Sequence, residues 1–286
     1  MYWQTSRHQI YLRRPQVMGI VNVTPDSFSD GGRRTGLSAI VRHAEQLIQD
    51  GADILDIGGE STRPGAVAVG LQEELARVLP VVREAVRMGV PVSVDTYKPQ
   101  VMQAVLDLGA DIINDIWGLR WHDGSDHPSA LQVVAKHPRC GVCLMHMHLQ
   151  PLTMQVEPMT GDVVPQVLDF LNQRAQALRD AQVDNKRIVF DPGIGFGKTV
   201  QQNFSLLARQ RELLAAGYPL LLGWSRKSSL AGMTAGAAAG RTLTAQERLA
   251  PSLAAAMLAV QRGAAVVRVH DVRETVQMLK VLEAAG

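Results

Sequence analysis

The sequence has little cysteine, few aromatic residues and almost no excess charge of either sign. Only two of its 286 residues are cysteine, which excludes a disulfide framework as the main source of stability. The formal net charge is +2 and aromatic residues make up 5% of the chain. It therefore has neither the basic excess nor the stacking surface of a nucleic-acid-binding protein, and we expect no nucleic acid as a partner.

Long hydrophobic runs are also missing. No apolar stretch approaches the roughly 20 residues of a membrane span, and residues 1–14 lack the apolar core of a signal peptide. We therefore expect no membrane partner and a cytoplasmic location. What is present, 46% hydrophobic and 20% charged residues, predicts a single α/β domain over residues 1–286, in which residues 1–16 form a polar lead-in.

The two cysteines and two nearby histidines are candidates for redox or metal chemistry. Cys140 and Cys143 are spaced like a redox pair but lie in an apolar run that reads as a strand. Residues three apart on a strand point to opposite faces, so we expect packing residues rather than a disulfide. His146 and His148 share a face and could hold a metal, but the further histidines that a metal-dependent barrel would supply are missing.

Short apolar runs that end in polar residues recur eight times along the chain. The clearest is RIVFDPGIGFGK, Arg187–Lys198, in which strand-forming residues lead to Asp191 and a glycine-rich turn. The other runs lie at 17–22, 53–58, 91–95, 111–115, 141–146, 219–227 and 265–270. Helical stretches separate them, so the sequence predicts a (β/α)8 TIM barrel. A doubly wound open sheet uses similar units and is the alternative.

All strands of such a barrel open at their carboxyl ends on one rim, where residues distant in sequence meet. Asp95, Asn114 and Asp191 follow three different strands. Helix capping could explain Asp95, and a turn could explain Asn114 with Asp115. Neither explains an amide between two carboxylates on the same rim. A carboxylate in a water-poor rim requires hydrogen-bond donors, which indicates a ligand with paired N–H groups.

Two long polar loops and one lysine lie on the same rim. Residues 23–36 and 60–70 are long for βα loops, so they are typical of lids or ligand clamps, although a disordered surface loop remains the alternative. Arg63 precedes a proline and suits a phosphate group, but a surface arginine is equally compatible. Lys227 could form a Schiff base, donate to a ligand or face solvent, and donation is favoured. Ser38 is predicted to cap the helix that follows.

The glycines after Asp191 do not form a nucleotide-binding motif. A phosphate-binding P-loop that ended at Lys198 and Thr199 would need glycine where Pro192 stands. The dinucleotide fingerprint would need its third glycine at Lys198. The sequence therefore indicates neither ATP nor NAD.

Eight motifs in order resemble the dihydropteroate synthase family of folate biosynthesis, the target of sulfonamides. They are MGIVNVTPDSFSDGG (18–32), DIGGESTRPG (56–65), SVDTYKP (93–99), INDI (113–116), LMHM (144–147), DPGIGFGK (191–198), SRKS (225–228) and RVHDV (268–272). The resemblance runs from about Val17 to Leu282. It implies a transferase that condenses 6-hydroxymethyl-7,8-dihydropterin pyrophosphate with p-aminobenzoate to give 7,8-dihydropteroate and pyrophosphate, with sulfonamides as inhibitors.

The resemblance also implies roles for individual residues. The pterin would be bound by Asp95, Asn114, Asp191 and Lys227. The pyrophosphate would be bound by Arg63, Arg268 and His270, with Mg²⁺ as cofactor near Asn22. The p-aminobenzoate would be framed by Thr62, Pro64, Phe196, Lys227 and Ser228, and Asp30 would assist Mg²⁺ or the amine. The family further suggests a homodimer.

Three positions depart from the family pattern. Tyr97 stands where serine is usual, Trp224 where methionine is common, and His148 with Leu149 where glutamine and glycine are common. Tyr97 and Trp224 could change the shape of a substrate pocket. A pterin-binding methyltransferase and a catalytically silent pterin-binding module are the alternative functions. The methyltransferase would not need the predicted pyrophosphate site, and the presence of every expected polar residue disfavours the silent module.

Overall fold

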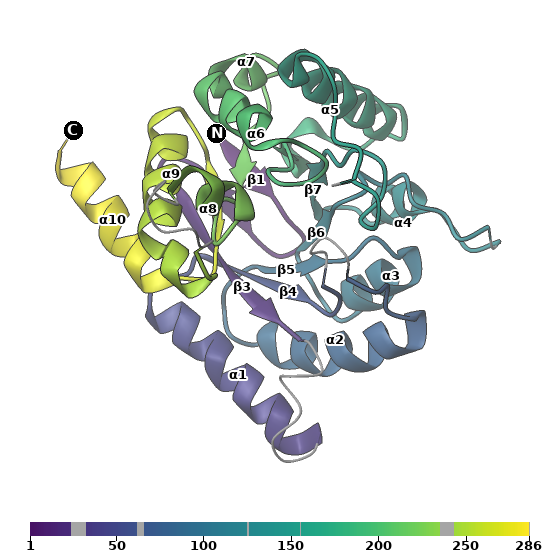
Figure 1. Cartoon of the computed structure of the whole chain (residues 1–286). Helices are drawn as coiled ribbons and strands as arrows, with labels where there is room; N and C mark the ends of the chain where they lie inside the picture. Colours follow the sequence, from purple (N-terminus) through teal and green to yellow (C-terminus); the bar gives the residue numbers. More distant parts are fainter. Residues whose placement is uncertain (24–32, 62–65, 125, 155, 235–242, 286) are drawn as a thin grey trace.

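Eight parallel strands form one sheet that curves into a barrel in the computed structural model, which describes the chain apart from residues 24–32, 62–65, 125, 155, 235–242 and 286 (Figure 1). The strand order is β8-β7-β6-β5-β4-β3-β10-β9. The strands are β3 (Gln16–Asn22), β4 (Ile54–Gly58), β5 (Val92–Asp95), β6 (Ile112–Asp115), β7 (Gly141–Met145), β8 (Ile188–Asp191), β9 (Leu221–Leu222) and β10 (Val266–Val269). Phe190 of β8 forms a parallel bridge to Leu220, just before β9, and this bridge nearly closes the barrel. The predicted TIM barrel is confirmed.

Helices surround the barrel (Figure 1). They are α1 (Arg33–Gln49), α2 (Leu71–Ala85), α3 (Pro99–Asp107), α4 (Ala130–Lys136), α5 (Val163–Asp180), α6 (Val200–Ala208), α7 (Gln210–Leu214), α8 (Ser228–Thr234), α9 (Leu249–Gln261) and α10 (Val272–Ala284). Helix α1 begins before the predicted cap at Ser38, because the polar residues that suggested a loop, including two arginines, are compatible with a helix. No helix in the described ranges is long and apolar enough to cross a membrane.

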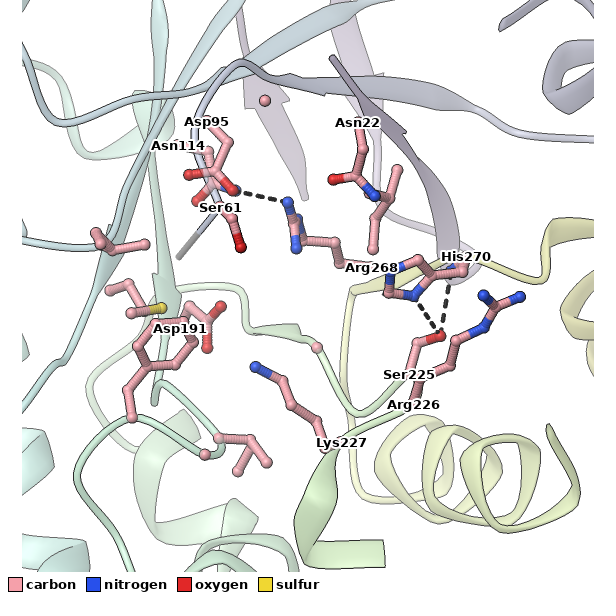
Figure 2. Close-up of a pocket in the computed structure, with 18 of the residues that line it drawn as sticks. Asn22, Ser61, Asp95, Asn114, Asp191, Ser225, Arg226, Lys227, Arg268 and His270 are labelled. Carbon is pink, nitrogen blue, oxygen red and sulfur yellow. Dashed lines mark hydrogen bonds and ion pairs between the residues drawn. The ribbon is translucent and has the colours of Figure 1, made fainter. Parts of the chain in front are cut away.

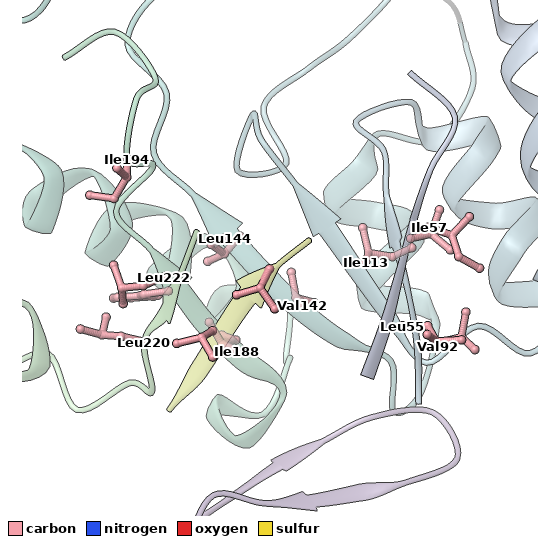
Figure 3. Packing of buried hydrophobic residues seen from close by; sticks show 14 of the residues in the cluster. Leu55, Ile57, Val92, Ile113, Val142, Leu144, Ile188, Ile194, Leu220 and Leu222 are labelled. Atoms are coloured by element: carbon pink, nitrogen blue, oxygen red, sulfur yellow. The ribbon is translucent and has the colours of Figure 1, made fainter. Parts of the chain in front are cut away.

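Successive residues of each strand point to opposite faces, and this alternation builds two apolar layers. The outward-facing residues, among them Ile57, Ile113 and Leu144, pack between the sheet and the helices (Figure 3). The inward-facing residues at the start of the strands, among them Ile54 and Val189, fill the lower half of the barrel. Only the upper half, at the carboxyl ends of the strands, is left for polar groups.

An antiparallel hairpin, β1 (Tyr2–Gln4) and β2 (Gln9–Tyr11), covers the amino-terminal end of the barrel. Fully buried Trp3 packs into the lower interior and donates its indole N–H to the Arg187 carbonyl at 2.8 Å. Nearby, Cys140 packs in the outer layer and Cys143 in the inner one, and both are free thiols. The expectation that these cysteines are packing residues is therefore confirmed.

Candidate active site

The carboxyl ends of the strands surround a cavity of about 570 Å³ (Figure 2). Nine of the predicted site residues line it: Asn22, Asp95, Asn114, Asp191, Phe196, Lys227, Ser228, Arg268 and His270. The other four, Asp30, Thr62, Arg63 and Pro64, lie outside the described residues. Residues from strands and loops far apart in the sequence therefore meet in one cavity.

The strand register explains why these side chains point inward. Asn114 follows the inward-facing Ile112 by two residues on β6, and Asp191 follows Val189 by two residues on β8. Arg268 stands in the same relation to Val266 on β10. Side chains two apart share a face, so each strand places its polar group directly above the apolar layer.

Arg268 joins two carboxylates in the floor of the cavity, and Figure 2 shows its contact with one of them, Asp95. Its Nε donates to Asp56 Oδ2 at 2.6 Å and its Nη2 donates to Asp95 Oδ2 at 2.8 Å. Asn114 Nδ2 lies 3.4 Å from the same oxygen of Asp56. Asp56 is fully buried and was not among the residues predicted to line the site. Its position two residues after Ile54 on β4 was the signal that could have identified it.

Burial dominates the electrostatics of this floor. It raises the pKa of Asp95 to about 7, and Asp56 and Glu74 add to that rise while Arg268 opposes it. Burial also raises the pKa of Asp191, although Asp191 Oδ1 accepts a 2.7 Å hydrogen bond from the Gly193 N–H. The floor is therefore rich in carboxylate oxygens held away from water, an arrangement that favours a ligand with several N–H donors.

The alternative roles of the rim residues can be tested directly. Helix α3 has Lys98 at its N-cap position without a side-chain cap, so Asp95 is not a helix cap. Asp115 accepts hydrogen bonds from the backbone of Trp117 at 2.8 Å and of Leu119 at 2.7 Å, and therefore shapes the turn. The turn is thus explained by Asp115 and not by Asn114, which instead lines the cavity.

Lys227 reaches the cavity from the side opposite Arg268 (Figure 2). It lies beyond the end of β9, outside any strand, which supports a ligand-donor role rather than a Schiff-base lysine held within a strand. Its Nζ lies 4.4 Å from the centre of the Phe196 ring, within the range of a cation–π contact. Lys227 and Asp191 thus present a donor and an acceptor to the same space.

Known proteins resemble this chain over almost all of its length. Residues 18–270 match the model of a family described as pterin binding enzyme. The chain belongs to this family. A dihydropteroate synthase of Neisseria meningitidis is 47% identical, with 99% of this chain and 97% of the relative covered. One from Escherichia coli strain K12 is 46% identical, with 96% and 92% covered.

Solved structures agree with the sequence comparisons. The dihydropteroate synthase of Burkholderia cenocepacia complexed with 7,8-dihydropteroate has a TM-score of 0.86 at 48% identity, over 99% of this chain and 96% of that one. The Yersinia pestis enzyme with a sulfonamide drug complex has a TM-score of 0.89 at 42% identity, over 100% and 99%. The family resemblance seen in the sequence motifs is confirmed.

In this member of the pterin-binding family, a second polar group lies beside Arg268. His270 Nδ1 lies 3.0 Å from Ser225 Oγ, and the His270 backbone N–H donates to the same oxygen at 3.1 Å (Figure 2). Ser225 lines the cavity but was assigned no role from the sequence. Its hydroxyl could have been recognised from its place directly before the arginine and lysine that follow β9.

One predicted metal ligand of this family member lies at the cavity. Within the described residues, no group of three or more histidine, cysteine, aspartate or glutamate side chains could hold a metal ion. His146 Nδ1 lies 2.9 Å from Lys198 Nζ, so this histidine is engaged with a lysine. Asn22, at the end of β3, is exposed and lines the cavity, and its amide oxygen is a suitable ligand for Mg²⁺.

Two of the three departures from the family pattern, Tyr97 and Trp224, lie behind the cavity wall. Tyr97 donates its hydroxyl to Glu60 at 3.0 Å and packs edge-on against Trp121. Trp224 is buried in the outer layer, where it packs against Phe204. Neither side chain is among those that line the cavity, so both act on its shape through their neighbours.

Proposed function

We propose that this chain is a dihydropteroate synthase, which condenses 6-hydroxymethyl-7,8-dihydropterin pyrophosphate with p-aminobenzoate. The observation that carries the proposal is the convergence of Asp95, Asn114, Asp191 and Lys227 beside Arg268 in one cavity. The near full-length similarity to proteins named dihydropteroate synthase supports it. So does the solved relative that contains 7,8-dihydropteroate.

The acidic floor suits the pterin ring. A pterin edge presents amino and ring N–H donors, which match the carboxylates of Asp95 and Asp191. Its ring acceptors match the amide of Asn114 and the ammonium of Lys227. Because burial raises the pKa of both carboxyl groups, pterin N–H groups relieve an unfavourable environment when they bind.

The reaction depends on where charge moves. Cleavage of the C–O bond places negative charge on a leaving diphosphate that is already anionic, so positioned cations stabilise the transition state. Arg268 and His270 lie on that side of the cavity, with Ser225 beside them, and Arg63 is proposed to join them. The pterin methylene becomes cationic, and the nearby aspartates favour that charge. The aromatic amine then attacks the methylene and loses its proton after the new bond has formed.

The p-aminobenzoate is proposed to lie against Phe196, Lys227 and Ser228, at the open side of the cavity, with Thr62 and Pro64 completing its frame. Ser228 is exposed at the start of α8, and the ring of Phe196 forms part of the wall. Sulfonamides, which resemble p-aminobenzoate, are proposed to compete for this position. The sulfonamide complex of the Yersinia pestis relative supports that assignment.

The donor set fits an Mg²⁺ ion that arrives with the substrate. One amide oxygen, from Asn22, faces the cavity, and Mg²⁺ usually completes its coordination with phosphate oxygens and water. Asp30 is proposed as a second ligand or as a contact for the amine. When bound, the ion would neutralise charge on the leaving diphosphate.

We further propose a homodimer that acts in the cytoplasm. Helix α9 is apolar on all sides: it buries Ala255, Ala256 and Ala259 against the barrel, while Leu253 and Met257 remain only partly buried. A second apolar face of this kind is suited to pack on a second subunit. The two free thiols, both buried, are compatible with a reducing compartment. Light scattering of the purified protein would test the dimer, which a monomeric mass would exclude.

The catalytic proposal is tested by assaying product formation. Purified protein is incubated with the pterin pyrophosphate, p-aminobenzoate and Mg²⁺, and 7,8-dihydropteroate and pyrophosphate are measured. We expect both products in equal amounts, none when either substrate is omitted, and inhibition by a sulfonamide that extra p-aminobenzoate overcomes. Pterin binding without product would instead indicate a silent module, and transfer of a methyl group from methyltetrahydrofolate would indicate a methyltransferase.

A further inference from the structure

Lys198 is a buried lysine directly behind the cavity wall, with only 3% of its surface exposed. Its Nζ lies 2.9 Å from the Gly193 carbonyl oxygen, 3.1 Å from the Phe196 carbonyl oxygen and 2.9 Å from His146 Nδ1. An ammonium group has three N–H donors and no acceptor. The three short contacts therefore satisfy all of its donors.

His146 is suited to accept one of these hydrogen bonds. Burial lowers the pKa of His146 to about 2, and the neighbouring Lys198 lowers it further, so the imidazole is neutral. A neutral ring whose Nδ1 accepts from Lys198 carries its proton on Nε2. The ring is also held edge-on against Phe170, with ring centres 5.0 Å apart. His146 thus fixes one end of the contact between the segment that follows β7 and the glycine-rich loop 192–197.

This loop depends on glycine for its backbone path, while its two larger side chains, Ile194 and Phe196, are buried in apolar clusters. Gly193 has a φ of +70°, and a Cβ there would lie 1.9 Å from the His146 carbonyl oxygen. Gly197 has a φ of +71°, and a Cβ there would lie 2.5 Å from His148 Cβ. The loop therefore lies directly on the segment that follows β7, and the hydrogen bonds from Lys198 hold it in that place.

The two loop residues whose carbonyls bind Lys198 also contact the catalytic groups. The Gly193 N–H donates to Asp191 Oδ1 at 2.7 Å, and the Phe196 ring lies 4.4 Å from Lys227 Nζ. We propose that Lys198 is a positioning residue, whose ammonium holds the glycine-rich loop so that Asp191 and Lys227 face the substrates at the correct separation. This inference deepens the proposed function and rests on it.

Charged groups of the site act on Lys198, although its burial disfavours the ammonium form. Burial lowers the pKa of Lys198 to about 7, and the charge of Lys227 lowers it further, while Asp191 opposes both effects. Lys198 therefore lies close enough to Asp191 and Lys227 for their charges to change its pKa. These are the two residues whose positions it is proposed to set.

The test replaces Lys198 by methionine, which keeps most of the side-chain volume but none of the N–H donors. Arg187→Met is the matched control, because Arg187 is also a buried cation that donates to backbone carbonyls, those of Cys140 and Val134, but at the base of the barrel. Melting temperature and steady-state constants for both substrates are measured for each variant. A purely structural role of Lys198 would make the two variants alike.

We expect Lys198→Met to raise KM for both substrates roughly tenfold, with a smaller fall in kcat, because misplaced contact groups weaken substrate binding. Arg187→Met should lower the melting temperature by a similar amount and leave both KM values within about twofold of wild type. Lys198→Gln, which retains amide donors, should fold and show an intermediate KM even if the methionine variant does not fold.

Two results would overturn the inference: Lys198→Met or Lys198→Gln with wild-type KM values, or Arg187→Met with the same loss as Lys198→Met. A wild-type protein that forms no dihydropteroate would refute the proposed function itself. The two failures are therefore distinguishable in one set of assays.

Discussion

Replacement of Arg268 by methionine should destabilise the protein and abolish most of its activity. The guanidinium is shared by Asp56, which is fully buried, and Asp95, which is 9% exposed. Both carboxylates raise the pKa of Arg268 above its ordinary value, although burial opposes that rise. Methionine fills much of the same space and cannot balance either charge, so both carboxylates would be left buried without a cation.

Removal of one partner from a buried ion pair costs about 3–5 kcal/mol. We therefore expect Arg268→Met to lower the free energy of unfolding by about 4 kcal/mol at pH 7. The same variant removes a cation from beside the leaving diphosphate, so turnover should fall by roughly 10²-fold or more.

The loss of stability should depend on pH. Arg268 lowers the pKa of Asp95 in the wild type, so its removal should raise that pKa above about 7, whereas an unfolded aspartate keeps an ordinary pKa of 3.8. Above pH 7 the native variant then binds more protons on Asp95 than the native wild type does, which stabilises the variant relative to the wild type as the pH falls. The difference in unfolding free energy between the two proteins should therefore shrink as the pH falls from 9 to 7, by at most about 1.4 kcal/mol per pH unit.

Urea unfolding of both proteins at pH 9 and pH 7 measures these quantities. The double variant Arg268→Met with Asp56→Asn is the control, because it removes one unbalanced charge and should recover about half of the lost stability while turnover stays low. Two results would show that Arg268 does not balance buried charge as described. One is a difference of less than about 1 kcal/mol at pH 7 between the free energies of unfolding of the wild type and of Arg268→Met, and the other is a difference that does not change with pH.

Three further substitutions test other parts of the structure. Asp191→Ala and Lys227→Ala should each lower kcat by roughly 10²-fold with an unchanged circular dichroism spectrum, and rates within a few-fold of wild type would contradict the pterin assignment. Gly193→Ala should lower the free energy of unfolding by at least about 2 kcal/mol, because a side chain there meets the His146 carbonyl. A thermal melt measures this loss, and an unchanged melting temperature would contradict it. Trp3→Ala should lower the free energy of unfolding by about 3–5 kcal/mol. It should leave KM unchanged, since Trp3 packs at the end of the barrel away from the cavity.

The sequence was sufficient to predict the barrel and the rim because both follow from local patterns. Each apolar run marks a strand, and the polar residue that ends it marks the rim, so Asp95, Asn114 and Asp191 could be placed together from their positions alone. The short strand β9, Leu221–Leu222, followed from the same repeat although it contains few residues. The start of α1 was less predictable, because its polar residues suit a loop and a helix equally.

Non-local partners could not be predicted. Arg268 was assigned to an anion, yet two of its nitrogens bind Asp56 and Asp95, which lie far from it in the sequence. That pairing depends on which residues of neighbouring strands share a face, and the register has to be known before it can be derived. Asp56 itself carried a local signal, its position two residues after Ile54, but its partner Arg268 becomes evident only once the barrel has closed.

Lys198 shows this limit most clearly. In the sequence it follows a glycine-rich turn that fails to match a phosphate-binding loop because Pro192 stands where glycine is needed, and no role was assigned to it. In the structure its ammonium is directed to two backbone carbonyls of its own loop and to a histidine on the neighbouring strand end. Backbone carbonyls occur at every position, so no residue pattern identifies them as partners. A lysine that binds a ligand and one that holds the loop around a ligand therefore have the same sequence signature, and only the effect of Lys198→Met on KM separates them.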